Sequence, residues 1–269
     1  MLPAIAKQEV HAMQKIFDFH THPFWDDASN ICNHKDIIKM AKEDMRPMFE
    51  KMGVVGIAGS VILLGDALPL WERIVACNDL ALKLREYLGD FYYPGVHIHP
   101  AYIPESVAQI RRFAEQGFHL VGELVPYMHG WSDYSCAEYS YLLDVCREYD
   151  MVVNMHSIDD DAMDKMVAAH KDVKIVMAHP GEYSSYLRHL RRMDISENYW
   201  LDLSGTGLFR HGMLARGIVQ YGAERFLFGS DYPTCNPAMF IGGVTLDELI
   251  SPEDKEKILY TNAKNLLNL

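Results

Sequence analysis

Histidine and acidic side chains stand at the ends of five apolar segments of this 269-residue chain. The segments are 15–20, 118–124, 151–156, 173–179 and 225–231, and the first is followed by a His-x-His pair. The six residues concerned are His20, His22, Glu123, His156, His179 and Asp231. Imidazole nitrogens and carboxylate oxygens are ligands of zinc and related divalent ions, so this set predicts a metal centre. Any one of these residues alone has an ordinary structural explanation, whereas six at segment ends point to a shared site.

Eight apolar segments have the length and composition of buried strands. Continuous runs of Val, Ile, Leu and Phe favour strands that are covered on both faces, as in parallel sheets. Between the runs, apolar residues step by three and four, which predicts helices with one buried stripe each. The clearest stripe comprises Leu70, Ile74, Cys77, Ala81, Leu84 and Leu88. The predicted strands are 15–20, 53–64, 91–100, 118–124, 151–156, 173–179, 199–205 and 225–231.

The alternation of strands and helices predicts an α/β fold, a (β/α)8 TIM barrel formed by a single domain. The domain covers 1–269, with 1–14 as an N-terminal extension and 251–269 as a C-terminal helix that opens with a capping pattern. An open doubly wound sheet is the alternative, but no GxGxxG or GxxxxGK(S/T) motif follows a strand. In a barrel the active site lies where the strands end, and His20 and His22 would reach one point there.

The charge balance argues against some partners. Lys and Arg number 25 and Asp and Glu number 37, which gives a net charge of −12. This argues against a nucleic-acid partner and against an anionic membrane surface. No apolar run approaches the length of about 18 residues that a membrane span needs. The five cysteines form no CxxC pair, which favours reduced thiols and a cytoplasmic protein.

Motifs along nearly the whole chain resemble those of the amidohydrolase superfamily. They are DFHTHPF at the first strand, a histidine that ends the fifth, AHPG at the sixth, FGSDYP at the eighth, and the terminal ILYTNAKNLLNL. The resemblance extends from Lys15 to Leu269 and is closest to the amidohydrolase-2 branch. That branch contains metal-dependent decarboxylases, hydratases, lactonases and hydrolases, so the resemblance implies a TIM barrel with a divalent metal and leaves the substrate open.

The resemblance also implies roles for the predicted ligands. It places four residues around a first metal ion: His20, His22, His156 and Asp231. His179 would bind a second ion or, with a single ion, act as a catalytic imidazole. Asp231 would also be the general base that takes a proton from metal-bound water, whose pKa zinc lowers to about 7. Zinc is the favoured metal for a histidine-rich site, with one or two ions per chain.

Glu123 departs from the pattern of the decarboxylase and lactonase relatives. They often carry Gly-x-Lys-Leu or a similar sequence at the fourth strand, where this chain has VGELVPY. A glutamate here looks more like the TatD-type deoxyribonucleases, or like the bridging glutamate of certain phosphotriesterase relatives. We therefore favour a two-metal site bridged by Glu123. The alternative is that Glu123 orients a ligating histidine without touching metal.

Five further residues are candidates for contact with a substrate: Trp25, His99, Tyr127, His129 and Arg210. The aromatic candidates and His129 follow strand ends and would wall a pocket, with loop packing as the alternative. His99 forms a second His-x-His with His97, so it is a candidate donor, a core residue or part of a second metal cluster. Arg210 would pair with a substrate carboxylate, unless it is an ordinary surface arginine.

The leading function is a metal-dependent hydrolase that cleaves an amide, ester or lactone of a small organic molecule with metal-activated water. The alternatives are a non-oxidative decarboxylase or hydratase of the amidohydrolase-2 type, a TatD-like phosphodiesterase or nuclease, and a non-catalytic metal-binding barrel. The net charge counts against the nuclease. A small molecule is the expected partner, and homo-oligomerisation stays open.

Overall fold

Eight parallel strands form the centre of the protein, as the computed structural model shows for residues 14–65, 67–207 and 210–269. Each strand lies within one of the eight predicted segments, except that β1 extends one residue beyond its segment, so the prediction of their positions is confirmed. The predicted N-terminal extension, apart from Gln14, lies outside the described residues. The strands are β1 (Ile16–Thr21), β2 (Val54–Gly59), β3 (Tyr92–Pro94), β4 (Leu120–Leu124), β5 (Val152–His156), β6 (Lys174–Ala178), β7 (Tyr199–Asp202) and β8 (Phe226–Leu227).

Backbone hydrogen bonds join the strands into a closed ring. β1 to β3 pair in parallel, as do β4 to β8. Between β3 and β4, Val96 N donates to Leu120 O and Gly122 N donates to Val96 O, both at 2.9 Å. Between β8 and β1, the Phe19 N to Phe228 O bond is also 2.9 Å long. The closed ring confirms the TIM barrel and excludes the open doubly wound sheet.

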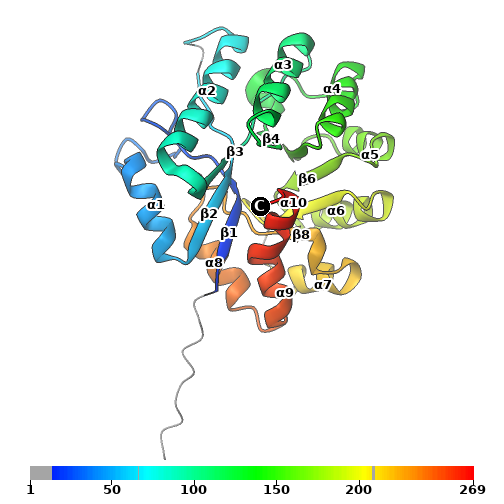
Figure 1. Ribbon diagram of the computed structural model, residues 1–269. Coiled ribbons are helices and arrows are strands. Elements are labelled where there is room, and N and C mark those ends of the chain that lie inside the picture. The colour runs from blue at the N-terminus through cyan, green and yellow to red at the C-terminus, as the bar shows by residue number, and fades with distance from the viewer. Residues whose placement is uncertain (1–13, 66, 208–209) are drawn as a thin grey trace, which may run out of the picture.

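The helices surround this ring, as Figure 1 shows. One follows each strand, because each apolar stripe needs a sheet face to cover it. The stripe predicted in α2 is confirmed from Ile74 to Leu88, all of whose apolar members are buried. The helices are α1 (Lys42–Lys51), α2 (Leu70–Leu88), α3 (Ile103–Ala114), α4 (Ala137–Glu148), α5 (Asp160–Ala169), α6 (Tyr183–Ile195), α7 (Met213–Tyr221) and α8 (Pro237–Thr245).

The last segment is a helix in three parts. α9 (Pro252–Glu256) runs into a π-helical turn (Lys257–Thr261) and then into α10 (Asn262–Leu266). Ser251 Oγ accepts a hydrogen bond from Asp254 N at 3.1 Å, which is the cap that the sequence pattern indicates. Phe228 N donates to Ile258 O at 2.9 Å, so this segment is tied to the barrel next to β8.

Short 3₁₀ turns connect some elements: Gly89–Phe91, Pro126–His129 and Ala223–Arg225. The five cysteines are all free thiols. Within the described parts of the chain, the helices are too short or too polar to cross a membrane.

Candidate metal centre

The six predicted ligands meet at the carboxyl ends of the strands. His20 lies in β1 and His22 directly follows it, while Glu123 lies in β4 and His156 ends β5. The two remaining residues, His179 and Asp231, follow β6 and β8. His20, His22 and Glu123 are buried at 1%, 2% and 3% exposure. Parallel strands bring residues from across the chain to one rim, and the buried donors are held close together there.

Glu123 lies at the centre, and its two carboxylate oxygens face different histidines. Oε2 is 3.2 Å from His22 Nε2 and 3.3 Å from His20 Nε2. Oε1 is 2.9 Å from His156 Nδ1 and 3.4 Å from His179 Nε2. The donor atoms thus form two sets that share one carboxylate. The resemblance grouped His156 with the residues of β1, whereas the structure groups it with His179.

Asp231 lies beside the first set. Its Oδ1 is 3.5 Å from His22 Nε2 and 3.8 Å from His20 Nε2. Two ligands held about 2.1 Å from one ion at a tetrahedral angle lie about 3.4 Å apart. The observed separations between donor atoms are close to this value.

The hydrogen bonds of the imidazoles favour a positive charge between the donor atoms. His22 Nδ1 is 3.1 Å from the backbone oxygen of Ser60, which only accepts, so Nδ1 carries the ring proton. In a neutral ring, the Nε2 lone pair then faces the carboxylates of Glu123 and Asp231. Lone pairs at this distance repel one another unless a proton or a metal ion lies between them. The donor set therefore fits a divalent metal.

Asp202, at the end of β7, orients two of the histidines. Its Oδ2 is 2.8 Å from His20 Nδ1, and its Oδ1 accepts from the hydroxyl of Ser204. Ser204 Oγ in turn is 2.9 Å from His179 Nδ1. These contacts aim Nε2 of both rings at Glu123, as carboxylates behind metal-binding histidines do. Sequence reasoning missed Asp202, although a carboxylate inside the apolar run 199–205 was a signal for it.

The site charges strongly affect one another in the metal-free chain. Burial alone would lower the pKa of His20, but Asp202 and Glu123 raise it well above its ordinary value. Burial would raise the pKa of Asp202, but the charge of His20 lowers it to about 2. Burial raises the pKa of Asp231. A proton on His20 thus supplies the positive charge that the donor set requires.

Two predicted ligands have an unusual backbone. His179 has φ 67° and Asp231 has φ 59°, in the left-handed region that residues other than glycine rarely adopt. Gly205 makes room for His179, because a Cβ at Gly205 would lie 2.3 Å from its Nδ1. Such strain persists where the surrounding structure fixes it, and it is frequent at functional sites.

A cavity of about 450 Å³ opens onto these residues. Its apolar wall consists of Ile31, Ile62, Val125, Tyr127 and Met128. No Lys or Arg is found among the described residues that line it. Its size and mixed lining are typical of a small-molecule site.

Of the five predicted substrate residues, Tyr127 lines this cavity, with its ring edge-on to His156 at 5.3 Å between centroids. Trp25 lies elsewhere: Lys83 Nζ is 3.8 Å from its ring centroid, and the ring also packs on Tyr87 of α2. The side chain of Arg210 pairs with Glu182 outside the cavity. Both residues are close to a strand end in sequence, but the loops that carry them direct their side chains away from the cavity.

His99 and His129 are also outside the cavity lining. His99 Nε2 is 3.0 Å from His129 O, and its ring packs against Trp131. Burial lowers the pKa of His129 to about 3, and its ring meets that of His97 at an interplanar angle of 87°. Both histidines thus make packing contacts outside the cavity lining, and the metal-donor groups of the described chain are the two around Glu123.

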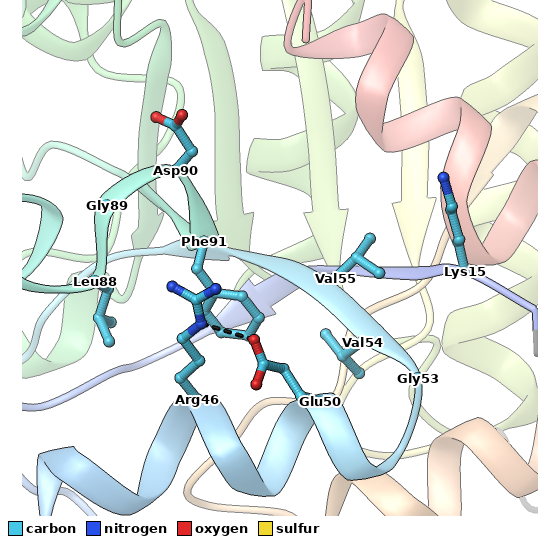
Figure 2. A pocket seen from close by; sticks show the side chains of 10 residues that line it. All are labelled: Lys15, Arg46, Glu50, Gly53, Val54, Val55, Leu88, Gly89, Asp90 and Phe91. Atoms are coloured by element: carbon cyan, nitrogen blue, oxygen red, sulfur yellow. Dashed lines mark hydrogen bonds and ion pairs between the residues drawn. The ribbon is translucent and has the colours of Figure 1, made fainter.

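A larger hollow, about 750 Å³, lies near the amino ends of β2 and β3 (Figure 2). Its charged side chains include Lys15, Arg46, Glu50 and Asp90. Arg46 Nε donates to Glu50 Oε1 at 2.7 Å, and the guanidinium lies over the ring of Phe91. The described residues that line it include no histidine, and it lies away from the end of the barrel where active sites form.

A family model described as amidohydrolase matches residues 17–269. The chain belongs to the amidohydrolase family. The prediction from the motifs is thereby confirmed, and the six donors of this amidohydrolase lie within the matched residues. The search among curated proteins gives no match.

Solved structures share the fold of this amidohydrolase. A 2,6-dihydroxybenzoate decarboxylase from Rhizobium is similar with a TM-score of 0.73 and 16% identity, over 95% of this chain and 99% of that one. A dihydroxybenzoic acid decarboxylase from Polaromonas, with bound manganese and 2-nitroresorcinol, has a TM-score of 0.69 and 16% identity, over 96% and 98%. A probable 2-pyrone-4,6-dicarboxylic acid hydrolase from Acinetobacter baumannii has a TM-score of 0.67 and 12% identity, over 95% and 100%. At these identities the similarity establishes the barrel fold.

Proposed function

We propose that this amidohydrolase is a metal-dependent hydrolase that cleaves an amide, ester or lactone bond in a small organic substrate. The observation that carries the proposal is the position of the Glu123 carboxylate, whose two oxygens face separate sets of imidazoles. A carboxylate with this placement suits two ions that hold a substrate and a water together. Sets of neutral imidazoles and carboxylates are typical ligands of zinc, which is the metal we propose.

The six donors can be assigned to the two proposed ions. His20, His22 and Asp231 would hold one ion, His156 and His179 the other, and Glu123 both. The bound metal supplies Lewis acidity and lowers the pKa of water to about 7. Asp231 faces both the first donor set and the cavity, so its carboxylate is placed to accept a proton from water.

The described lining of the cavity offers no protein cation to a substrate carboxylate. None of the described lining residues is Lys or Arg, whereas two of them, Glu123 and Asp231, are carboxylates. An anionic substrate would therefore depend on the metal ions alone to balance its charge. Tyr127 and the apolar wall instead suit a neutral ring or chain.

Decarboxylation is the second candidate. Two of the structural relatives above are named as dihydroxybenzoate decarboxylases, and one of them contains manganese. In such a reaction the metal would hold the substrate carboxylate in place of a protein cation. Carbon dioxide release from 2,6-dihydroxybenzoate, compared with hydrolysis of phenyl acetate, δ-valerolactone and benzamide, separates the two reactions.

Elemental analysis of the purified, zinc-loaded protein tests the metal centre. We expect two ions per chain in the wild type and at most one in Glu123→Gln, because the amide cannot bridge two cations as a carboxylate does. Glu86→Gln, an exposed change in α2, is the matched control and keeps both ions. One ion in the wild type and in both variants would contradict the bridge, and no ion in the wild type would contradict the metal centre.

Turnover tests the role of Asp231. Asp231→Asn removes the proton acceptor, and we expect kcat to fall about 10²- to 10⁴-fold on the substrate that the wild type hydrolyses. A variant that keeps full kcat would assign the proton transfer to another group.

The cytoplasmic location predicted from the free cysteines is also a proposal, which cell fractionation tests.

A further inference from the structure

A row of polar side chains that the metal centre does not use runs from the wall of the cavity into the interior of the protein. Ser157, which follows His156, and His189, in α6, both line the cavity. His189 Nε2 lies 3.3 Å from Ser157 Oγ, and His189 Nδ1 lies 2.7 Å from the hydroxyl of Tyr199. Because His189 is only 1% exposed, its ring nitrogens depend on these neighbours for hydrogen bonds.

Arg192 stands at the far end of this row and is completely buried, at 0% exposure. Its guanidinium donates to Asp164 Oδ1 at 2.5 Å and to Asp160 Oδ1 at 2.6 Å, which bind α6 to α5. Its Nη1 is 3.3 Å from His189 Nδ1. Arginine has donors and no acceptor, so in this contact Arg192 donates and Nδ1 accepts.

The direction of the remaining bonds follows from that one. A neutral imidazole with an accepting Nδ1 carries its proton on Nε2, so His189 donates to Ser157 Oγ. Burial and the charge of Arg192 lower the pKa of His189 to about 3, which keeps the ring neutral. Since Ser157 Oγ accepts from His189, its own hydroxyl proton is directed elsewhere. Ser157 lines the cavity, so that proton is available to a molecule bound there.

We propose that Ser157 binds the substrate by donating a hydrogen bond to an acceptor oxygen, and that His189 and Arg192 are positioning residues that hold it as a donor. The proposal rests on the hydrolase function above, in which the acceptor is the carbonyl oxygen of the amide, ester or lactone. Ser157 follows a predicted metal ligand, so the bound oxygen lies beside the metal centre. A fixed donor at this oxygen gains strength as negative charge develops on it.

Nitrogen NMR of the zinc-loaded protein with ¹⁵N-labelled histidine reads the tautomer directly. The signals of His189 are those that disappear in His189→Gln. We expect the ring proton on Nε2 in the wild type and also in Tyr199→Phe, because Arg192 still donates to Nδ1. A proton on Nδ1 in either protein overturns the proposal.

Kinetics test the hydroxyl donor. We expect Ser157→Ala to lower kcat/KM for phenyl acetate and δ-valerolactone about 10- to 100-fold with unchanged metal content, and Ser157→Thr to restore most of it. Ser140→Ala is the matched control, because Ser140 Oγ also bonds a histidine, His170 Nε2 at 2.7 Å, outside the cavity. Equal kcat/KM in the wild type and Ser157→Ala overturns the assignment.

The two measurements separate this inference from the proposed function. If the zinc-loaded wild type hydrolyses no ester, lactone or amide, the hydrolase proposal fails, and the tautomer of His189 still supports or overturns the row of donors. If the wild type hydrolyses them and Ser157→Ala does so equally well, the hydrolase stands and the role of Ser157 falls.

Discussion

At the scale of single residues, the contacts behind the imidazoles determine what their outer nitrogens can do. The Ser60 carbonyl fixes the proton of His22, and Asp202 does the same for His20. Each ring is therefore held in one rotamer and one tautomer, with Nε2 directed at the carboxylate of Glu123. A centre built this way binds a cation with little loss of side-chain freedom, because the donors are already held in place.

Asp202→Asn tests this support. The amide nitrogen or oxygen must replace a carboxylate oxygen opposite His20 Nδ1, so the ring loses a charged acceptor. We expect zinc affinity to fall about 10- to 100-fold, measured by competition with a chelator. Asp172→Asn, an exposed change beside Arg147, is the control and should keep wild-type affinity. Equal affinities in all three proteins would show that Asp202 has no role in orienting the ligands.

Sequence alone could predict that the six candidate ligands lie close together, because each of them lies at the end of an apolar run. It did not group His156 with His179, because that depends on the side-chain directions at β5 and β6. It did not exclude Trp25 or Arg210 from the cavity either. Their directions are set by the packing of Trp25 on α2 and by the pairing of Arg210 with Glu182, which no local pattern encodes.

At the scale of elements, the turns after the strands carry the site. The turn after β7 passes so close to the one after β6 that only a glycine fits at 205. The run 199–205 predicted a strand here, but β7 ends at Asp202, and the residues that follow, Ser204 and Gly205, contact His179 instead of continuing the sheet. Periodicity predicts where a strand lies better than where it ends, since the end is decided by contacts with neighbouring turns.

Gly205→Ala tests the steric argument. Its Cβ would lie 2.3 Å from His179 Nδ1, so the imidazole must move. We expect the variant to lose the second ion and to unfold at lower denaturant concentration. Gly117→Ala is the control, because Gly117 also has a positive φ, 82°, with no atom within 4 Å of the added Cβ. If both variants lose the same stability and keep both ions, the contact with His179 is unimportant.

At the scale of the whole molecule, several buried histidines are neutral in the folded protein. Burial lowers the pKa of His97 to about 4 and that of His129 to about 3. A buried group of this kind binds a proton more readily in the unfolded chain. Its contribution to stability is therefore complete above the ordinary pKa of about 6.5 and is lost as the pH falls toward the folded value.

Acid unfolding measures this effect. We expect the free energy of unfolding of the wild type to fall between about pH 6.5 and pH 4, by up to about 3 kcal/mol for each such histidine. His129→Phe removes one of them, so its stability relative to the wild type should rise as the pH falls. Denaturant titrations at pH 8 give the packing cost, and titrations at pH 4 add the protonation. A difference between the two proteins that does not change with pH would contradict the neutral His129.

The hydrogen bonds between β8 and β1 also determine the stage of folding at which the six donors come together. Asp231 N donates to His20 O at 2.9 Å, so the last ligand along the chain reaches the first only when the ring closes. During synthesis, the other five donors emerge before Asp231, because it is the last of the six along the chain. The first donor set, unlike the second, is therefore joined by Asp231 only after ring closure, so binding of an ion by all of its members would mark a chain that has finished folding.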